Sequence, residues 1–249
     1  MPRLITVSKL EEGVFELHMN DPVHQNRLSE ELSAEIIAAL RALANEPALR
    51  VLVMTGRQDV FCAGATLEQL EKMTAGEMPQ KALAIPDEML AFPLPIIGAL
   101  EGHAVGGGLC VALCCDMTIA SESSRYGANF TALGFTPGMG IVSLLPMQVG
   151  HAFASEMLLG AKLYKGRELH RRQLFSEVLP AREVRRAALD LAHSIAGKPR
   201  EVLSMVKEAL AVPRRRALAD ASVLERLMHL SSFASPGSKA LIQSMYLSS

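Results

Sequence analysis

The amino-acid sequence predicts an α/β fold, with a mainly parallel sheet followed by a helical region. Over the first two-thirds of the chain, strand patterns alternate with helix patterns, which favours parallel strands joined by crossovers. Beyond about residue 150 the patterns are helical. Of the 249 residues, 49% are hydrophobic and 20% charged, so the chain can bury a sizeable core and is not a disordered protein. We expect a core over residues 1–195 and a C-terminal helical region over 196–249, acting as one functional unit.

Four segments carry strand patterns. Residues 13–19 alternate apolar and polar side chains, as a half-buried strand does. Residues 50–55, 95–100 and 117–120 are short runs rich in β-branched and apolar residues. Between the first two, Ser29 is predicted to cap a helix whose apolar residues recur at helical spacing.

The last hundred residues are predicted to form a layer of helices. Glycine and proline interrupt the helical patterns at Gly160, at 197–199 and at Pro213. We expect this layer to pack against another subunit. The predicted helices cover 151–159, 165–174, 181–196, 200–211 and 215–234.

Composition and charge exclude several classes of function. Aromatic residues make up 4% of the chain and Trp is absent, whereas proteins that stack nucleic-acid bases are usually richer in aromatics. The net charge of −1 provides no overall field to attract nucleic acid or a membrane. The charge is uneven, because the first hundred residues are acidic and the rest basic. The basic run Arg214–Arg216 is either a solvated helix face or a docking point for an anionic partner.

The cysteines indicate buried thiols in a reducing compartment. Cys110, Cys114 and Cys115 lie in one apolar stretch with no other ligand at metal-binding spacing, and Cys62 stands alone, so we expect no metal site and no disulfide framework. The first residues lack the apolar core of a signal peptide, and the apolar run over 104–115 is too short to span a bilayer. We therefore expect a cytoplasmic protein.

Two glycine-containing loops are candidates for the chemistry. The first, over 61–65, follows the strand at 50–55; the second, over 106–108, follows the strand at 95–100. Each leads into a predicted helix, where unpaired N–H groups and the helix dipole favour negative charge. Two such turns on neighbouring strands can each aim one N–H group at a single oxygen, forming an oxyanion hole. The second loop is neither a dinucleotide fingerprint nor a P-loop.

The order of these motifs resembles the crotonase (enoyl-CoA hydratase/isomerase) superfamily. The resemblance rests on VLVMTG followed by FCAGA, then ALEGHAVGGG, then YGANFTALGFTPGMG, and it covers nearly the whole chain. It implies a spiral of ββα turns, a C-terminal helical region, and a trimer or dimer of trimers. It also implies an oxyanion hole for a thioester carbonyl, with the amides of Ala65 and Gly107 as donors.

Two departures from the superfamily pattern separate this chain from the hydratases. Hydratases of the superfamily use two glutamates to activate water, and the corresponding positions here fall at Cys110 and near Phe130. A pocket without that carboxylate pair cannot perform general acid–base hydration in their manner. A decarboxylation needs only the oxyanion-stabilising amides and one acid to return a proton to carbon.

GHAVGGG, the ANF and FTPGMG segments and the late LMH are similar to the decarboxylases of polyketide β-branching. That resemblance implies conversion of a 3-methylglutaconyl thioester on an acyl carrier protein to a 3-methylcrotonyl-type thioester, without a metal or redox cofactor. It also implies a catalytic His, matching His229, and a catalytic Lys, for which Lys72 and Lys81 are the candidates. We expect further residues to line the substrate site: Cys62, Ala63, Gly64, Gly106, Cys110, Phe130 and Met139.

Two other interpretations stay open from the sequence. One is an enoyl-CoA isomerase or hydratase that uses non-standard acids. The other is a degenerate, non-catalytic crotonase-fold scaffold. The intact glycine loops and the low aromatic content argue against the scaffold.

Overall fold

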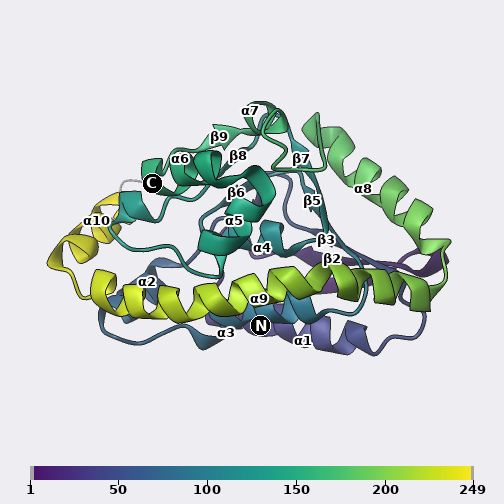
Figure 1. Ribbon diagram of the computed structural model, residues 1–249, viewed down its shortest axis with the longest axis horizontal. Coiled ribbons are helices and arrows are strands. Elements are labelled where there is room, and N and C mark those ends of the chain that lie inside the picture. Colours follow the sequence, from purple (N-terminus) through teal and green to yellow (C-terminus); the bar gives the residue numbers. More distant parts are fainter. Residues whose placement is uncertain (1–2, 248–249) are drawn as a thin grey trace.

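The computed structural model describes residues 3–247 and contains two sheets (Figure 1). The larger sheet has the strand order β1-β2-β3-β5-β7-β10, in which β1 is antiparallel to β2 and the other pairs are parallel. The smaller sheet has the order β4-β6-β8-β9, with β9 antiparallel to β8. The predicted α/β class is confirmed.

The strands of the larger sheet include all four that the sequence predicted, namely β2 (Val14–Met19), β3 (Val51–Thr55), β5 (Ile96–Leu100) and β7 (Met117–Ser121). Strands β1 (Ile5–Lys9) and β10 (Glu177–Leu179) complete its edges. Four strands of two or three residues form the smaller sheet, too short for a periodic pattern to reveal. They are β4 (Val60–Cys62), β6 (His103–Val105), β8 (Arg125–Gly127) and β9 (Tyr164–Lys165).

The chain repeats one unit, and this repetition places the glycine loops. In each turn a strand of the larger sheet is followed by a strand of the smaller sheet and then by a helix. Thus β3 and β4 lead into α2 (Leu67–Thr74), while β5 and β6 lead into α4 (Gly107–Cys114). The ββα spiral implied by the family resemblance is confirmed.

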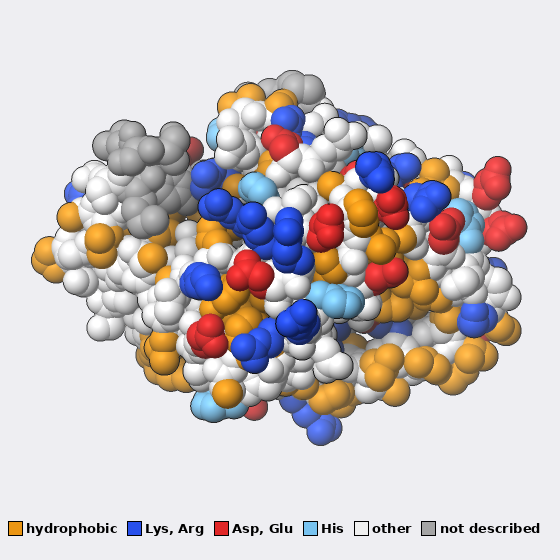
Figure 2. Space-filling view, turned by 90° about the horizontal axis from the view of Figure 1, so that it is seen from above, with side chains coloured by type: hydrophobic (Ala, Val, Ile, Leu, Met, Phe, Trp, Pro, Cys, Tyr) orange, Lys and Arg blue, Asp and Glu red, His pale blue; other side chains and the backbone are white. Residues whose placement is uncertain are grey.

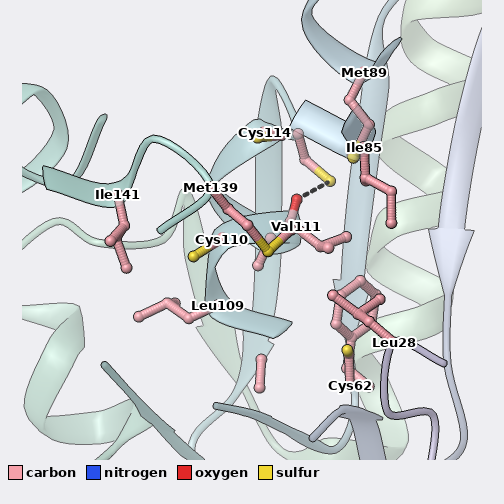
Figure 3. Close-up of a cluster of buried hydrophobic side chains, with 14 of the residues drawn as sticks. Leu28, Cys62, Ile85, Met89, Leu109, Cys110, Val111, Cys114, Met139 and Ile141 are labelled. Carbon is pink, nitrogen blue, oxygen red and sulfur yellow. Dashed lines mark hydrogen bonds between the residues drawn. The ribbon is translucent and has the colours of Figure 1, made fainter. Parts of the chain in front are cut away.

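Helices cover both faces of the larger sheet. On one face, α8 (Ala181–Ala196) packs small and β-branched side chains on valines and isoleucines of β2, β3, β5 and β7. The other face carries the main core with α1 (Glu30–Ala44), α3 (Gln80–Ala91) and α4. Ser29 caps α1 as predicted, since its side chain accepts a hydrogen bond from the Leu32 amide. Figure 3 shows α4 at the centre of this core, with Leu109 and Val111 projecting from it into the packed interior.

One long helix replaces two that the sequence predicted. The structure shows α9 (Arg200–Phe233) continuing through Pro213, whose ring would ordinarily break a helix. Contacts on both sides of the proline hold it in place: Lys207 binds Asp116, and Arg214 donates to the Leu113 carbonyl. The predicted break at Pro213 is therefore wrong, because these tertiary contacts outweigh the local preference. The helix packs along α3 and α5 (Ile141–Val149), as Figure 1 shows.

The remaining helical elements are short. The predicted helix over 165–174 is shorter than expected, because β9 occupies its first position and a turn, in which Gln173 has a φ of 56°, follows His170. The structure also has a last helix that the sequence did not predict. These elements are α6 (His151–Gly160), α7 (Gly166–His170) and α10 (Pro236–Leu247), with single 3-10 turns η1 (Glu11–Gly13) and η2 (Thr131–Leu133).

Candidate active site

The two glycine loops meet at one end of the smaller sheet. Strands β4 and β6 pair in parallel, with Cys62 opposite Ala104, so the segments that follow them leave the sheet side by side. Gly64 has a φ of 86°, and a Cβ on it would lie 2.9 Å from the Val105 carbonyl oxygen and 3.5 Å from the Gly107 nitrogen. Glycine is required there by both its backbone angle and this close approach.

The backbone after each loop places an amide at this meeting point. Gly107 is the first residue of α4, so its N–H group has no partner within the helix. Ala65 directly follows Gly64 and precedes Thr66, whose hydroxyl caps α2 by accepting from the Gln69 amide. Two helix starts therefore face one point, and this arrangement can stabilise an oxygen that gains negative charge.

A cavity of about 430 Å³ opens beside the loops and contains most of the predicted site. Its walls are mainly apolar, and the Phe130 and Phe135 rings meet edge to face at 5.9 Å between centroids. Met139, whose φ of 61° is unusual for a residue with a side chain, places its sulfur against Gly107. The predicted residues that line this cavity are Ala63, Gly64, Ala65, Gly106, Gly107, Phe130, Met139 and His229.

His229 reaches the cavity from α9, far from the loops in sequence. Its Nε2 lies 3.0 Å from the Thr136 carbonyl oxygen, which can only accept, so Nε2 carries a proton and Nδ1 is the nitrogen that can gain one. Its ring packs edge to face against Phe233. Gly138 makes room for the ring, since a Cβ there would lie 2.6 Å from Cε1 of His229. Burial lowers the pKa of His229 below its usual value, although the carbonyls of Thr136 and Pro137 oppose this effect.

A buried carboxylate, Glu225, supports the turn that contacts His229. It lies one helical turn before His229 on α9 and accepts hydrogen bonds from the amides of Gly140, at 2.8 Å, and Val142, at 3.4 Å. Burial raises the pKa of Glu225 to about 7. It caps the start of α5 and is not among the residues that line the cavity. Sequence reasoning missed it, because a single Glu in a charged helix gives no signal of burial.

Asp59 is the carboxylate that contributes to the cavity lining among residues 3–247, and it lies at the rim. Its side chain is 68% exposed and is held by Arg57 at 3.2 Å. Its neighbour at the rim, His103, accepts a hydrogen bond from the Arg125 amide through Nδ1. The interior wall therefore carries no carboxylate in the described part of the chain, as the sequence predicted from Cys110 and Phe130.

Four predicted residues lie outside the cavity, which corrects that part of the expectation. Lys72 points to solvent and binds Glu68 at 2.7 Å, four residues earlier on α2, and Lys81 binds Glu30 at 3.3 Å. The two predicted cysteines, Cys62 and Cys110, are fully buried in the core instead.

The thiol of Cys110, which Figure 3 labels within the core cluster, donates to the carbonyls of Gly106 and Gly138. Burial raises the pKa values of Cys110 and Cys62, so both are inert thiols. Cys110 supports both turns from behind rather than contacting a ligand.

Four polar residues of the cavity were missed by sequence reasoning, namely Gln25, Arg27, Asp59 and Gln69. Arg27 lies near the mouth and donates to the carbonyls of Ala63 and Ala65. Gln69 lines the wall from α2 and is buried, whereas Lys72 on the same helix is exposed. Thr66 and Gln69 have the spacing of a capping box, a common helix start that gives no hint of a cavity residue.

The described residues offer neither a metal site nor a membrane span. Across residues 3–247, no three His, Cys, Asp or Glu side chains lie together in a way that would hold a metal ion. Within the same range, no helix combines the length and hydropathy needed to cross a bilayer.

The spiral fold, paired glycine turns and adjoining cavity define a crotonase-type enzyme. The family model for enoyl-CoA hydratase/isomerase matches residues 9–247, and the chain belongs to this family.

The chain is 33% identical to the bacillaene synthase decarboxylase PksI of Bacillus subtilis over 243 residues, covering 98% of both chains. A solved structure described as part of a dehydratase/decarboxylase couple in polyketide β-branching has a TM-score of 0.93 and 33% identity, over 98% of this chain and 99% of the other. The ECH2 decarboxylase domain of CurF from Lyngbya majuscula has a TM-score of 0.91 and 28% identity, over 98% of this chain and 100% of that domain. Two of these three relatives are thus named decarboxylases of the crotonase superfamily, and the third belongs to a dehydratase/decarboxylase couple.

Proposed function

We propose that this chain decarboxylates a 3-methylglutaconyl-type thioester carried on an acyl carrier protein, giving a 3-methylcrotonyl-type thioester during polyketide β-branching. One observation carries the proposal. The paired turns open onto an apolar cavity in which the described residues provide one buried histidine, His229, and a single carboxylate, Asp59, confined to the rim. Its decarboxylase relatives support the same reaction class.

The proposed reaction breaks the bond between the terminal carboxylate and the γ-carbon of the acyl chain. The electron pair of that bond moves through the conjugated double bond onto the thioester oxygen, and CO2 leaves. The amides of Ala65 and Gly107 stabilise the resulting dienolate, and each such donor contributes about 3–4 kcal/mol in related sites. A proton then returns to the γ-carbon, so atoms and charge balance without a cofactor.

His229 is the proposed proton donor. Its Nδ1 must be protonated to act as the acid, because Nε2–H is committed to the Thr136 carbonyl. In the empty cavity, burial opposes that protonation. The substrate carboxylate and then the dienolate bring negative charge next to the ring, which raises its pKa when the acid is needed.

Product mass separates the proposed reaction from its alternative. The 3-methylglutaconyl thioester on carrier protein is incubated with the enzyme and followed by mass spectrometry. Loss of CO2 is expected. Addition of water, or a shifted double bond at constant mass, contradicts the proposal and favours an enoyl-CoA hydratase or isomerase.

Gly107→Pro tests the oxyanion hole and the non-catalytic scaffold together. Proline fits the first position of a helix and removes the amide N–H that the mechanism uses, while adding side-chain bulk. Gly107→Ala is the matched control, because it keeps the N–H group and adds comparable bulk near Leu28 and Met139. We expect the proline variant to lose about 100- to 1,000-fold in kcat relative to the alanine variant. Equal rates would contradict the oxyanion role.

The carrier protein is proposed to dock on basic residues beside the cavity mouth. His103 at the rim binds the backbone of Arg125, and Arg125 pairs across β8 and β9 with Lys165. Both basic side chains are exposed. Figure 2, which views the molecule from above Figure 1, shows a group of Lys and Arg side chains on that face. The run at Arg214–Arg216 is a poorer dock, since Arg214 and Arg215 bond to carbonyls within the chain.

The double variant Arg125→Glu/Lys165→Glu tests this docking. We expect it to raise KM for the carrier-bound substrate, most strongly at low salt, and to leave KM for a pantetheine-bound substrate unchanged. An equal effect on both substrates would contradict carrier docking on this surface.

A homotrimer or dimer of trimers is the proposed assembly. One face of α9 exposes large apolar side chains, more than a soluble monomer usually leaves uncovered on one helix. Light scattering after size exclusion measures the mass, and a monomer would contradict this assembly. The exposed residues are Val202, Met205, Val206, Leu210, Val223, Leu224, Leu227 and Leu230.

A further inference from the structure

Gln69 is a buried side chain whose polar atoms have no partner. It is 6% exposed, and neither its Nε2 nor its Oε1 has a hydrogen-bond partner among the described residues. Leaving such a group buried and unpaired costs about 1–3 kcal/mol. Its backbone is fixed, since its amide donates to the Thr66 hydroxyl at 3.2 Å. The unpaired amide is therefore held at the start of α2, and its nitrogen and oxygen are available to hydrogen-bond a ligand.

The side chain belongs to the wall of the cavity. Gln69, Leu70 and Met73 share the inward face of α2 and all line the cavity, whereas Lys72 on the same helix faces solvent. Three other polar side chains of the lining have partners within the chain: Arg27 binds loop carbonyls, Asp59 binds Arg57, and His229 binds Thr136. Gln25 and Asn129 also line the cavity, but neither is as deeply buried as Gln69. The amide of Gln69 has unused hydrogen-bonding capacity, and its covered nitrogen and oxygen can reach an acyl chain in the cavity once the side chain turns toward it.

We propose that Gln69 is a specificity-determining residue that hydrogen-bonds the carboxylate of the acyl chain before it leaves as CO2. This inference rests on the proposed decarboxylation. The Nε2 amide protons are donors that suit a carboxylate, and the thioester oxygen is already assigned to the amides of Ala65 and Gly107.

A neutral donor suits a carboxylate that must leave. During the reaction the negative charge moves from the carboxylate to the thioester oxygen. A lysine in the wall would stabilise the starting carboxylate by a full ion pair and so oppose that movement. The amide of Gln69 holds and orients the carboxylate by a weaker interaction, and Met73 beside it keeps the surroundings apolar. The charged Lys72 is held outside by Glu68.

Binding measurements test this role without relying on turnover. Two non-reactive thioether analogues on pantetheine are compared by calorimetry, one with the terminal carboxylate and one with a methyl group in its place. In Gln69→Leu we expect the carboxylated analogue to bind about 10-fold more weakly, with the methyl analogue unchanged. In Gln69→Glu we expect a larger loss for the carboxylated analogue, because two carboxylates then face each other. Glu71→Gln, on the solvent side of α2, is the matched control and leaves both affinities unchanged.

Thermal unfolding separates this role from a structural one. Gln69→Leu removes an unpaired buried amide, so its Tm is expected to equal or exceed that of the wild type. A clear fall in Tm with an unchanged affinity ratio for the two analogues would overturn the inference. The proposed function is judged separately, by release of CO2. If the wild type releases CO2 and Gln69→Leu keeps the wild-type affinity ratio for the two analogues, only the role of Gln69 is refuted. Wild type that fails to release CO2 refutes the decarboxylation.

Discussion

Gly138→Ala moves His229 without altering any group that takes part in the chemistry. A Cβ at this position lies 2.6 Å from Cε1 of His229, whereas ordinary contacts begin at 3.4 Å, so the two atoms must separate by 3.4 − 2.6 = 0.8 Å. The ring is not a flexible chain end, because Thr136 holds Nε2 and Phe233 packs against its face. A displacement of about 1 Å in a catalytic group costs about 100-fold in rate, and we expect kcat/KM for decarboxylation to fall by that amount.

The assay needs a measure of folding and a matched control. Overpacking of this kind costs about 1–3 kcal/mol, which lowers Tm by several degrees and leaves the variant folded at assay temperature. Gly197→Ala is the control, since nothing lies within 4 Å of its Cβ, and its activity should match the wild type. A folded Gly138→Ala variant with wild-type kcat/KM would refute the assignment of His229 as the proton donor.

Three further variants test the placement of charged groups. Lys72→Met is expected to keep wild-type kcat/KM, since Lys72 binds Glu68 at the surface; a loss measured with the carrier-bound substrate would return Lys72 to the site. Lys207→Met is expected to lower the free energy of unfolding by about 3 kcal/mol in urea titrations, because it leaves the partly buried Asp116 with a weaker partner; a change near zero would contradict this. Glu225 keeps its proton to about pH 7 when folded and loses it near pH 4.5 when unfolded, so the free energy of unfolding falls as pH rises between these values, by about 3 kcal/mol. Glu225→Gln should flatten that fall in urea titrations at several pH values, and an unchanged slope would refute the assignment.

The sequence predicted the elements whose patterns are local. Strands β2, β3, β5 and β7 carry apolar runs long enough to recognise, and Ser29 has the side chain that a helix start requires. The strands of the smaller sheet have two or three residues each, and their existence depends on pairing with one another. No periodicity can reveal such strands, although the loops that they position were visible as glycines.

The residues of the candidate site likewise include some that the sequence could predict and some that it could not. Gly64 and Gly107 could be predicted, because a close approach of two backbones requires glycine, and these glycines are recognisable in the sequence. Gln69 and Lys72 could not be distinguished, since both are polar residues on a short helix. Only the rotation of that helix about its axis decides which side chain faces the cavity. Lys72 was predicted because the family resemblance implies a catalytic Lys, whereas the burial of Gln69 is visible only in three dimensions.

The position of His229 shows why the C-terminal region belongs to the site and is not an appendage. His229 can enter the cavity because α9 continues as one helix past Pro213, held by Lys207 and Arg214 against the core. If the helix broke at Pro213, its second half could move away from the turn at Gly138. The lack of a side chain at Gly138 makes room for the imidazole of His229. The contacts of Lys207 and Arg214, far from the cavity, thus fix the direction of the helix that carries the proposed proton donor. Loss of Lys207 should therefore weaken catalysis as well as stability, a coupling that a helix merely resting on the surface would not show.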